Sequence, residues 1–212
     1  MNYTLPTVVF HATTAEHIAS IKTEILIDRP DAKTHLDFGK GFYTSTNLDQ
    51  ALSRASDLQE ARRNPNGVLA KKDRGVVLQF DLNQDLLYSI DKGKYKIFPF
   101  DDEEWAKFVV YNRAKRRNGT PFVPHSFEWT YGPMADGPTW SICQNNFNGL
   151  ITIDELLNGY NDPQTGENTR GIRPYVDGYD QLVFHNDQWV NQVLTNCKIH
   201  TMLVNVLRAK GG

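Results

Sequence analysis

The residues with the most chemical potential lie in the stretch His35–Thr46, whose sequence is HLDFGKGFYTST. Two glycines one residue apart flank its lysine, and glycine lets the backbone adopt positive φ or approach a ligand closely. A short aromatic strand, Phe42–Ser45, is expected to follow, with alternate side chains on opposite faces. One face can pack into a core, while Tyr43 and Ser45 offer a phenol ring and a hydroxyl on the other.

Two nucleotide-binding motifs can be excluded for this stretch. A phosphate-binding P-loop needs a glycine five residues before the Gly-Lys pair and a Ser or Thr after it, and those places hold Thr34 and Gly41. A dinucleotide fingerprint needs a third glycine three residues after Gly41, and that residue is Thr44. From spacing alone, the simplest interpretation is a glycine-rich turn before a core strand.

A histidine near the start of the chain is a second candidate for chemistry. The β-branched and aromatic run Thr7–Phe10 predicts a buried strand that ends at His11. Isoleucines at helical spacing in residues 18–21 predict a short helix next, capped by Thr13 or Thr14. A lone histidine where a strand gives way to a turn is more often a hydrogen-bonded structural residue than a catalytic one.

Hydrophobic periodicity predicts the elements that must position these residues. Helices are expected from Leu48 to near Arg63, at Glu103–Arg117, at Ile153–Leu157 and at Trp189–Leu194. Strands are expected at Val76–Phe80, Leu86–Ile90, Gln181–His185 and Ile199–Leu207. Asn47 and Gln50 form a candidate capping box for the first of these helices. Two long stretches are expected to be irregular: Thr120–Pro138, as a lid or wall of a site, and Asn158–Gly178, as a mobile loop.

Charge argues against a protein that coats nucleic acid, because the net charge is −2. This net charge is still compatible with a local basic patch. The last turn of the helix expected at Glu103–Arg117 carries Arg113, Lys115, Arg116 and Arg117. The simpler interpretation is that these cations complement the helix dipole, and the alternative is a contact with an anion or nucleic acid.

Composition fits one α+β domain, since 212 residues with 40% hydrophobic and 23% charged residues are ordinary for a soluble globular protein. The lone cysteines, Cys143 and Cys197, have no zinc spacing and suit a reducing compartment. No secretory signal is visible, and no stretch approaches the roughly 20 apolar residues of a membrane span. We therefore expect a cytoplasmic protein without a membrane partner, with export by a signal-less route left open.

Three places in the chain, taken together, resemble a known class of enzymes. His11, the turn and strand Gly39–Tyr43, and Gln181 in Tyr-Asp-Gln-Leu-Val-Phe resemble the signature places of the diphtheria-toxin and poly(ADP-ribose) polymerase class of ADP-ribosyltransferases. That class carries His-Gly, Gly-Lys-Gly-Ile-Tyr and Glu-Tyr-hydrophobic in the same order. The gap between the first two places is short and the gap to the third is long, as here.

The chain also resembles a family of uncharacterised bacterial ADP-ribosyltransferase-like domains. Its marks are Leu-Asp-Phe-Gly-Lys-Gly-Phe-Tyr, a Trp-containing helix that ends in Arg, a Gly-Pro-hydrophobic-Ala-Asp segment and a last strand with Gln. The matching segments are Leu36–Tyr43, Trp105–Arg113, Gly132–Asp136 and Gln181–Phe184. This resemblance covers most of the chain and is the more specific of the two.

The resemblance implies a fold and a ligand. It implies a single domain, residues 1–212, of the α+β class, with the split, mostly antiparallel β-sandwich of the ADP-ribosyltransferase type and flanking helices. NAD⁺ would bind in a cleft of that sheet, as substrate and without a metal. The NAD⁺ contacts implied are His11, Ala12, Thr13, Gly41, Tyr43 and Ser45, and the catalytic residues implied are His11, Tyr43 and Gln181.

The residue types fit the chemistry that the resemblance implies. His11 would hydrogen-bond the ribose hydroxyls, the backbone of Ala12 would hold the nicotinamide amide, and the ring of Tyr43 would stack on the nicotinamide. Cleavage of the glycosidic bond develops an oxocarbenium-like ribose while neutral nicotinamide leaves, so the site must constrain the ribose and stabilise positive charge. A stacked phenol and two hydrogen-bonding groups can do this without a metal.

Departures from the pattern limit the reaction. Ala12 replaces a glycine, which is tolerated if φ is negative and only the backbone is used. The second stacking ring of the polymerases is missing after Tyr43, and Phe100, Tyr131 or Trp140 could take its place. Gln181 stands where the class carries a catalytic glutamate, and an uncharged amide cannot deprotonate an acceptor. Chain elongation is therefore not expected, and single transfer would need another base, such as Asp136, Asp180 or His185.

Three functions follow from the resemblance. The first is a mono-ADP-ribosyltransferase with a protein or nucleic-acid acceptor, acting as a bacterial toxin or defence effector that an antitoxin or immunity protein neutralises. The second is a catalytically silent NAD⁺-binding or interaction module, which the glutamine favours. The third is an NAD⁺ glycohydrolase, in which water replaces the acceptor.

Overall fold

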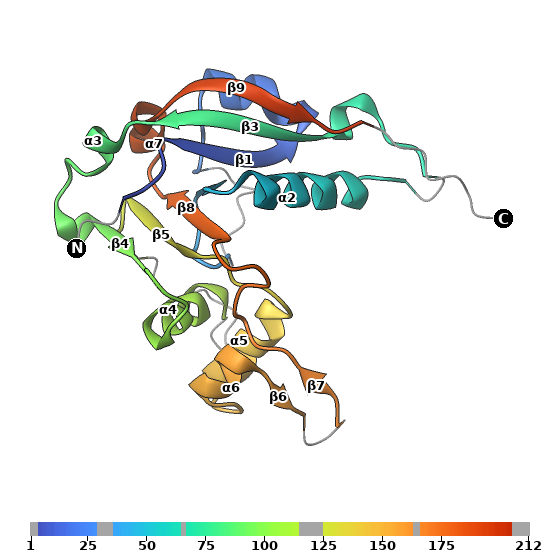
Figure 1. The fold of residues 1–212 in the computed structure, drawn as a ribbon, viewed down its shortest axis with the longest axis vertical. Helices are drawn as coiled ribbons and strands as arrows, with labels where there is room; N and C mark the ends of the chain where they lie inside the picture. Colours follow the sequence, from blue (N-terminus) through green and yellow to red (C-terminus); the bar gives the residue numbers. More distant parts are fainter. Residues whose placement is uncertain (1–3, 29–35, 65–66, 115–124, 163–165, 205–212) are drawn as a thin grey trace. The chain divides into compact units, whose positions relative to one another are not determined.

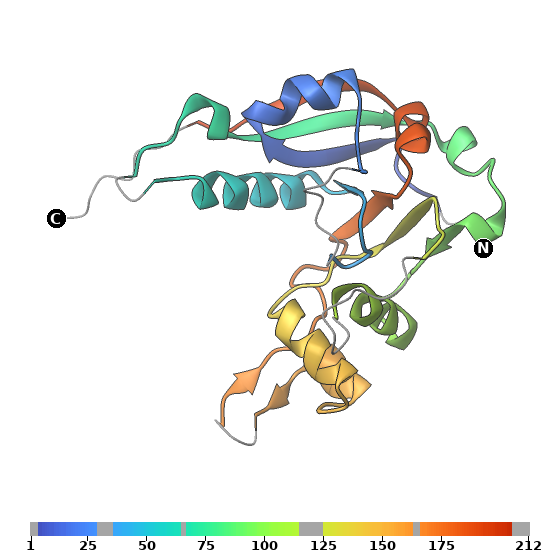
Figure 2. The same cartoon turned by 180° about the vertical axis from the view of Figure 1, so that it is seen from behind.

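The structure is a computed structural model that describes residues 4–28, 36–64, 67–114, 125–162 and 166–204. The chain forms two compact units, each assembled from separate stretches of sequence (Figures 1 and 2). Unit 1 consists of residues 1–26, 43–90 and 187–212, and unit 2 of residues 27–42 and 91–186. The expectation of a single domain stays a prediction.

Unit 1 contains antiparallel strands in the order β2-β1-β3-β9. The strands are β1 (Val8–Thr14), β2 (Phe42–Ser45, which enters unit 1 at Tyr43), β3 (Gly75–Leu82) and β9 (Leu194–Met202). The helices are α1 (Ile18–Thr23), α2 (Leu48–Ala61), α3 (Gln84–Leu87) and α7 (Asp187–Val193), with 3-10 turns at Ala15–His17 and Lys71–Asp73.

Helix α2 covers one face of β1 and β3 (Figure 1). Its apolar side packs through Ala51 and Ala55 against Val77 of β3. Small residues on the buried face let the helix approach the sheet closely, because no long side chain holds the two apart. The helix predicted from Leu48 to near Arg63 is therefore confirmed, with its end at Ala61.

Unit 2 contains the strand order β4-β5-β8. Strand β4 (Tyr95–Ile97) pairs in parallel with β5 (Trp129–Pro133), and β5 pairs antiparallel with β8 (Asp180–Phe184). The helices are α4 (Glu103–Arg113), α5 (Thr139–Phe147) and α6 (Ile153–Asn158), with a 3-10 turn at Lys92–Lys94 and a small antiparallel hairpin of β6 (Tyr160–Asn161) and β7 (Asn168–Thr169). The chain is thus a mixture of helices and mostly antiparallel strands, and the sandwich of the ADP-ribosyltransferase type stays a prediction.

Strand β1 corrects the prediction for the N-terminal segment. It pairs with β3 through Thr14, opposite Gly75, so it does not end at His11. His11 therefore lies inside a strand, opposite Leu78. Thr14 stands at the start of the following 3-10 turn, but its side chain makes no capping hydrogen bond there. The long partner strand extends β1 beyond the end that local sequence suggested.

Two predictions between β3 and β5 were wrong. The strand predicted at Leu86–Ile90 does not form: Leu86 and Leu87 end helix α3, whose first turn is capped by the Asn83 side chain accepting from the Leu86 N–H, and residues 88–90 are a turn. Helix α4 ends at Arg113 and not at Arg117, since Ala114 is extended with ψ at 150°. The remaining basic residues predicted for that helix, Lys115–Arg117, lie outside the described residues.

Both stretches predicted to be irregular contain regular structure. Strand β5 lies within Thr120–Pro138 and the β6–β7 hairpin within Asn158–Gly178. Strand β5 itself includes Gly132 and Pro133, residue types that are unfavourable in strands, yet all of its residues are buried. Helix α5 was not predicted. Strand β9 begins at Leu194, five residues before the predicted Ile199, because register shifts against β3 break its alternation. It ends at Met202, and residues 205–207 of the predicted strand lie outside the described residues.

The helices at Ile153–Leu157 and near Trp189, and the strands at Val76–Phe80 and Gln181–His185, are confirmed with small shifts of their ends. In the described part of the chain, no helix combines the length and the apolar content needed to cross a membrane.

The two glycines of the Gly-Lys-Gly turn have different physical roles within unit 2. Gly39 has φ at +79°, a conformation that side chains disfavour. A Cβ at Gly41 would lie 2.5 Å from Val183 Cγ1 and 2.7 Å from the Phe184 carbonyl oxygen. Gly41 is therefore required for close packing of the turn on β8.

We expect Gly41→Ala to lower the free energy of unfolding by about 1–3 kcal/mol, because the added methyl group must displace the backbone of β8. Gly93→Ala is the matched control, since a Cβ there meets nothing within 4 Å. Its stability should change by less than about 0.5 kcal/mol or increase slightly. Urea denaturation of both variants measures the difference, and equal losses would contradict this account of Gly41.

Candidate functional site

Two of the three signature residues contact each other in unit 1. The Nδ1 atom of His11 lies 2.7 Å from the carbonyl oxygen of Tyr43, where β1 runs beside β2 with Phe10 opposite Ser45. A carbonyl oxygen can only accept, so Nδ1 carries the proton and, in the neutral ring, Nε2 is the acceptor. The contact thus fixes the tautomer of His11. Both side chains are partly exposed.

The other NAD⁺ contacts predicted in unit 1 lie on the same two strands. Ala12 is partly exposed and pairs with Val77, whereas Thr13 is buried. Ser45 serves the start of α2: its Oγ atom lies 2.5 Å from Gln50 Oε1 and accepts from the Asn47 N–H at 3.0 Å. Of the predicted Asn47–Gln50 capping box, the N-cap half is confirmed, because the Asn47 side chain accepts from the N–H groups of residues 49 and 50, whereas the Asn47 N–H donates to Ser45.

A buried carboxylate organises unit 2. Asp37 is 3% exposed, and its two oxygens accept hydrogen bonds from three groups. Arg113 Nε donates to Oδ1 at 2.5 Å, while the Ala135 N–H and Gln181 Nε2 donate to Oδ2 at 3.1 and 3.0 Å. A buried charge is tolerated when it is paired and hydrogen-bonded in this way.

This Asp37 network joins the four segments on which the sequence resemblance rests. Asp37 belongs to Leu36–Tyr43, and its donors belong to the segments at Trp105–Arg113, Gly132–Asp136 and Gln181–Phe184. Sequence reasoning did not single out Asp37. Its place inside the Leu36–Tyr43 motif was the available hint, and that motif marks the segment but not the distant partners of Asp37.

Gln181 is the third signature residue, and it lies in unit 2. It is the second residue of β8, it faces Gly132 of β5 in register, and it is 5% exposed. Strand β8 thus confirms the predicted strand around Gln181. The structure brings His11 and Tyr43 together in unit 1 and places Gln181 with Asp37 in unit 2, and the catalytic role of each stays a prediction.

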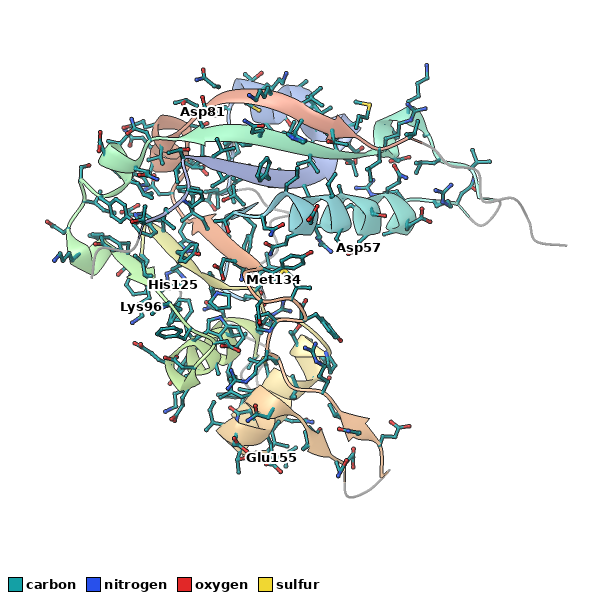
Figure 3. The ribbon with its side chains drawn as sticks, in the orientation of Figure 1. Asp57, Asp81, Lys96, His125, Met134 and Glu155 are labelled. Carbon is teal, nitrogen blue, oxygen red and sulfur yellow. The ribbon has the colours of Figure 1, made fainter. Side chains whose placement is uncertain are left out.

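Two partly buried histidines hold the glycine-rich turn. His185 Nδ1 donates to the Lys40 carbonyl oxygen at 2.7 Å, and its Nε2 lies 3.0 Å from the Thr130 hydroxyl. His125, labelled in Figure 3, donates from Nε2 to the Phe38 carbonyl oxygen at 3.0 Å. The two rings meet edge to face, 4.5 Å apart.

Desolvation favours the neutral form of both histidines. Desolvation, with a smaller contribution from nearby His125, lowers the pKa of His185 to about 3. Desolvation also lowers the pKa of His125, against the opposing effect of its hydrogen bond to Phe38. Both nitrogens of His185 are occupied, so this residue is a poor general base near neutral pH.

The remaining candidate bases differ in their surroundings. Burial, with a smaller contribution from the charge of Asp37, raises the pKa of Asp136, while a hydrogen bond from the Tyr175 N–H lowers it. Asp180 accepts from the Tyr131 hydroxyl at 2.5 Å. A half-buried carboxylate with a raised pKa is the better proton acceptor, so Asp136 is the stronger candidate.

The three rings proposed to cover nicotinamide are also distinguishable. Tyr131 is 4% exposed and packs inside unit 2, whereas Phe100 is 68% and Trp140 55% exposed. A buried ring whose hydroxyl is already bonded has no free face for stacking, so Phe100 and Trp140 are the better candidates. Within the described ranges, no three His, Cys, Asp or Glu side chains are grouped closely enough to hold a metal ion.

The described residues define an α+β protein with a buried charged network in unit 2 and a histidine–tyrosine contact in unit 1. Residues 8–196 match the family described as "Protein of unknown function (DUF3990)", and the chain belongs to that family. Searches among curated proteins and among solved structures gave no match.

The lowered pKa of His185 predicts a pH dependence of stability. Because the folded pKa of His185 lies below the unfolded value of about 6.5, the unfolded state binds more protons between those values and stability falls as pH decreases. His185 alone should contribute up to about 1.4 kcal/mol per pH unit in that window. Urea denaturation between pH 7 and 4.5 measures the slope.

His185→Asn should flatten this slope, since an amide can still donate to the Lys40 carbonyl but does not titrate. His17→Asn is the control, because that side chain is 43% exposed. An unchanged slope in His185→Asn would show that His185 does not titrate on unfolding.

Proposed function

We propose that the chain is a mono-ADP-ribosyltransferase that cleaves NAD⁺ and transfers ADP-ribose to a protein or nucleic-acid acceptor. The observation that carries the proposal is the 2.7 Å hydrogen bond between His11 and the Tyr43 carbonyl. It joins two signature residues of the resembled class on adjacent strands and fixes the histidine tautomer. The family description itself contains no activity, so the proposal rests on this contact and on the sequence resemblance.

The residues of unit 1 fit the parts of NAD⁺ that they would hold. With its Nδ1 proton donated to Tyr43, His11 offers Nε2 as an acceptor for a ribose hydroxyl. The partly exposed ring of Tyr43 offers a face for nicotinamide, and the backbone at Ala12 and Thr13 would hold the amide. These groups would orient the ribose and the leaving group relative to each other.

The proposed reaction breaks the bond between ribose C1′ and the nicotinamide nitrogen. The bonding electrons leave with nicotinamide, which becomes neutral, and the acceptor nucleophile forms a new bond to C1′ and loses a proton. Asp136 is the candidate base for that proton, because burial raises its pKa. Gln181 supplies no charge, so we propose single transfer and not chain elongation.

A second candidate is a catalytically silent NAD⁺-binding module. The specific observation in its favour is that the Gln181 amide is already bonded to Asp37 and carries no charge. An NAD⁺ glycohydrolase is the remaining alternative, in which water takes the place of the acceptor. The proposed setting, from the resemblance, is a toxin or defence effector in the bacterial cytoplasm with an antitoxin or immunity protein as partner.

Purified protein incubated with NAD⁺ and a bacterial lysate should release nicotinamide and label one class of polymer, protein or nucleic acid. We expect Tyr43→Ala to reduce release at least about tenfold, because stacking on nicotinamide is lost, whereas Tyr43→Phe keeps the ring and most of the activity. His11→Ala should behave as Tyr43→Ala does. His17→Ala is its matched control.

The same experiment separates the candidate functions. Release without label would indicate the glycohydrolase. No release, but a melting temperature that rises with NAD⁺ and no longer rises in Tyr43→Ala, would indicate the silent binder. Neither release nor a thermal shift in the wild type would refute the NAD⁺ proposal.

A further inference from the structure

We infer that Asp37 is a positioning residue that sets the chemistry of position 181. It binds the amide nitrogen of Gln181, leaves the amide oxygen as the atom offered to a ligand, and excludes a carboxylate from this position. The use of that oxygen toward a ribose hydroxyl of NAD⁺ rests on the proposed function. The orientation of the Gln181 amide does not depend on the proposed function.

The first step concerns what Asp37 can do. An ionised carboxylate accepts hydrogen bonds and cannot donate them. Among the described residues, the three groups that bond to its oxygens are donors: the guanidinium of Arg113, the backbone N–H of Ala135 and the amide nitrogen of Gln181. The Arg113 side chain is 18% exposed and that of Asp37 4% exposed, so water competes little with these bonds.

The second step fixes the orientation of Gln181. If its amide were flipped, Oε1 would stand about 3 Å from Asp37 Oδ2 with lone pairs facing each other, which is unfavourable where the local dielectric is low. Nε2 therefore faces Asp37, and Oε1 faces away. Among the described residues, Oε1 accepts no hydrogen bond.

The third step explains why glutamine, and not glutamate, suits this place. A glutamate there would put a second carboxylate about 3 Å from Asp37, and a pair of like charges at that distance cannot both ionise cheaply. The bond from Arg113 Nε goes to the other oxygen of Asp37, Oδ1. Gln181 therefore presents an acceptor without charge, its Oε1. Donation from its Nε2 to a carboxylate polarises the amide and strengthens Oε1 as an acceptor.

Stability measurements test the exclusion of a carboxylate without any ligand. In Gln181→Glu, the nearby charge of Asp37 should raise the pKa of the introduced carboxyl, so the unfolding equilibrium constant should rise about 100-fold at pH 8. Because the folded state then holds its proton more tightly than the unfolded state, this deficit should disappear below both pKa values. The deficit of Gln181→Met should not change between pH 8 and pH 4.

Asp37→Asn combined with Gln181→Glu restores a single carboxylate near Arg113. That double variant should lose the pH-dependent part of the deficit, even if both substitutions lower stability. A deficit of Gln181→Glu that is small, or that does not depend on pH, would overturn the inference. A role for Gln181 in packing alone would produce no such pH dependence.

An NMR measurement on the wild type covers the case in which a variant fails to fold. The side-chain amide protons of Gln181, assigned by their absence in Gln181→Met, should exchange with water at least about tenfold more slowly than those of exposed glutamines. Exchange as fast as theirs would overturn the inference. Failure of the NAD⁺ proposal would leave both readouts unchanged, because neither uses NAD⁺.

Discussion

The buried carboxylate of Asp37 is the constraint on which the rest of unit 2 depends. Removing a charge from water is costly, and the cost is offset when several donors converge on it. Here the donors come from α4, from the segment after β5 and from β8. Trp105 of α4 adds a further bond, since its indole nitrogen donates to the Pro133 carbonyl at 3.0 Å. The segments that mark the resembled family are therefore held together by one charged centre.

The glycine-rich turn next to Asp37 serves packing in this structure. Gly41 lies against β8, neutral histidines hold the carbonyls of Phe38 and Lys40, and the Lys40 side chain pairs with Asp28. A fixed turn on the same segment as Asp37 limits how far that carboxylate can move. The chemistry offered at position 181 thus follows from packing around the turn as well as from the residue type.

Sequence patterns predicted elements whose signals are local, such as α2 with its Ala51 and Ala55 face and the strand around Gln181. These patterns failed where residues distant in sequence determine the type or the length of an element. Strand β1 runs past His11 because β3 is long, and the Asn83 cap starts helix α3 where a strand was predicted.

For the site, the motif pointed to His11 and Tyr43, which do contact each other. Asp37 was missed because its donors lie 76 to 144 residues away in sequence, and no local pattern reveals such partners.

The most direct test of this account compares two cations on α4. Arg113 pairs with Asp37, whose side chain is 4% exposed, whereas Lys107 pairs with Glu103, which is 57% exposed. If the Asp37 network holds unit 2 together, Arg113→Met should lower the free energy of unfolding by about 3 kcal/mol or more, because it leaves a buried charge uncompensated. Lys107→Met should cost less than about 0.5 kcal/mol. Similar small losses in both variants would contradict the account.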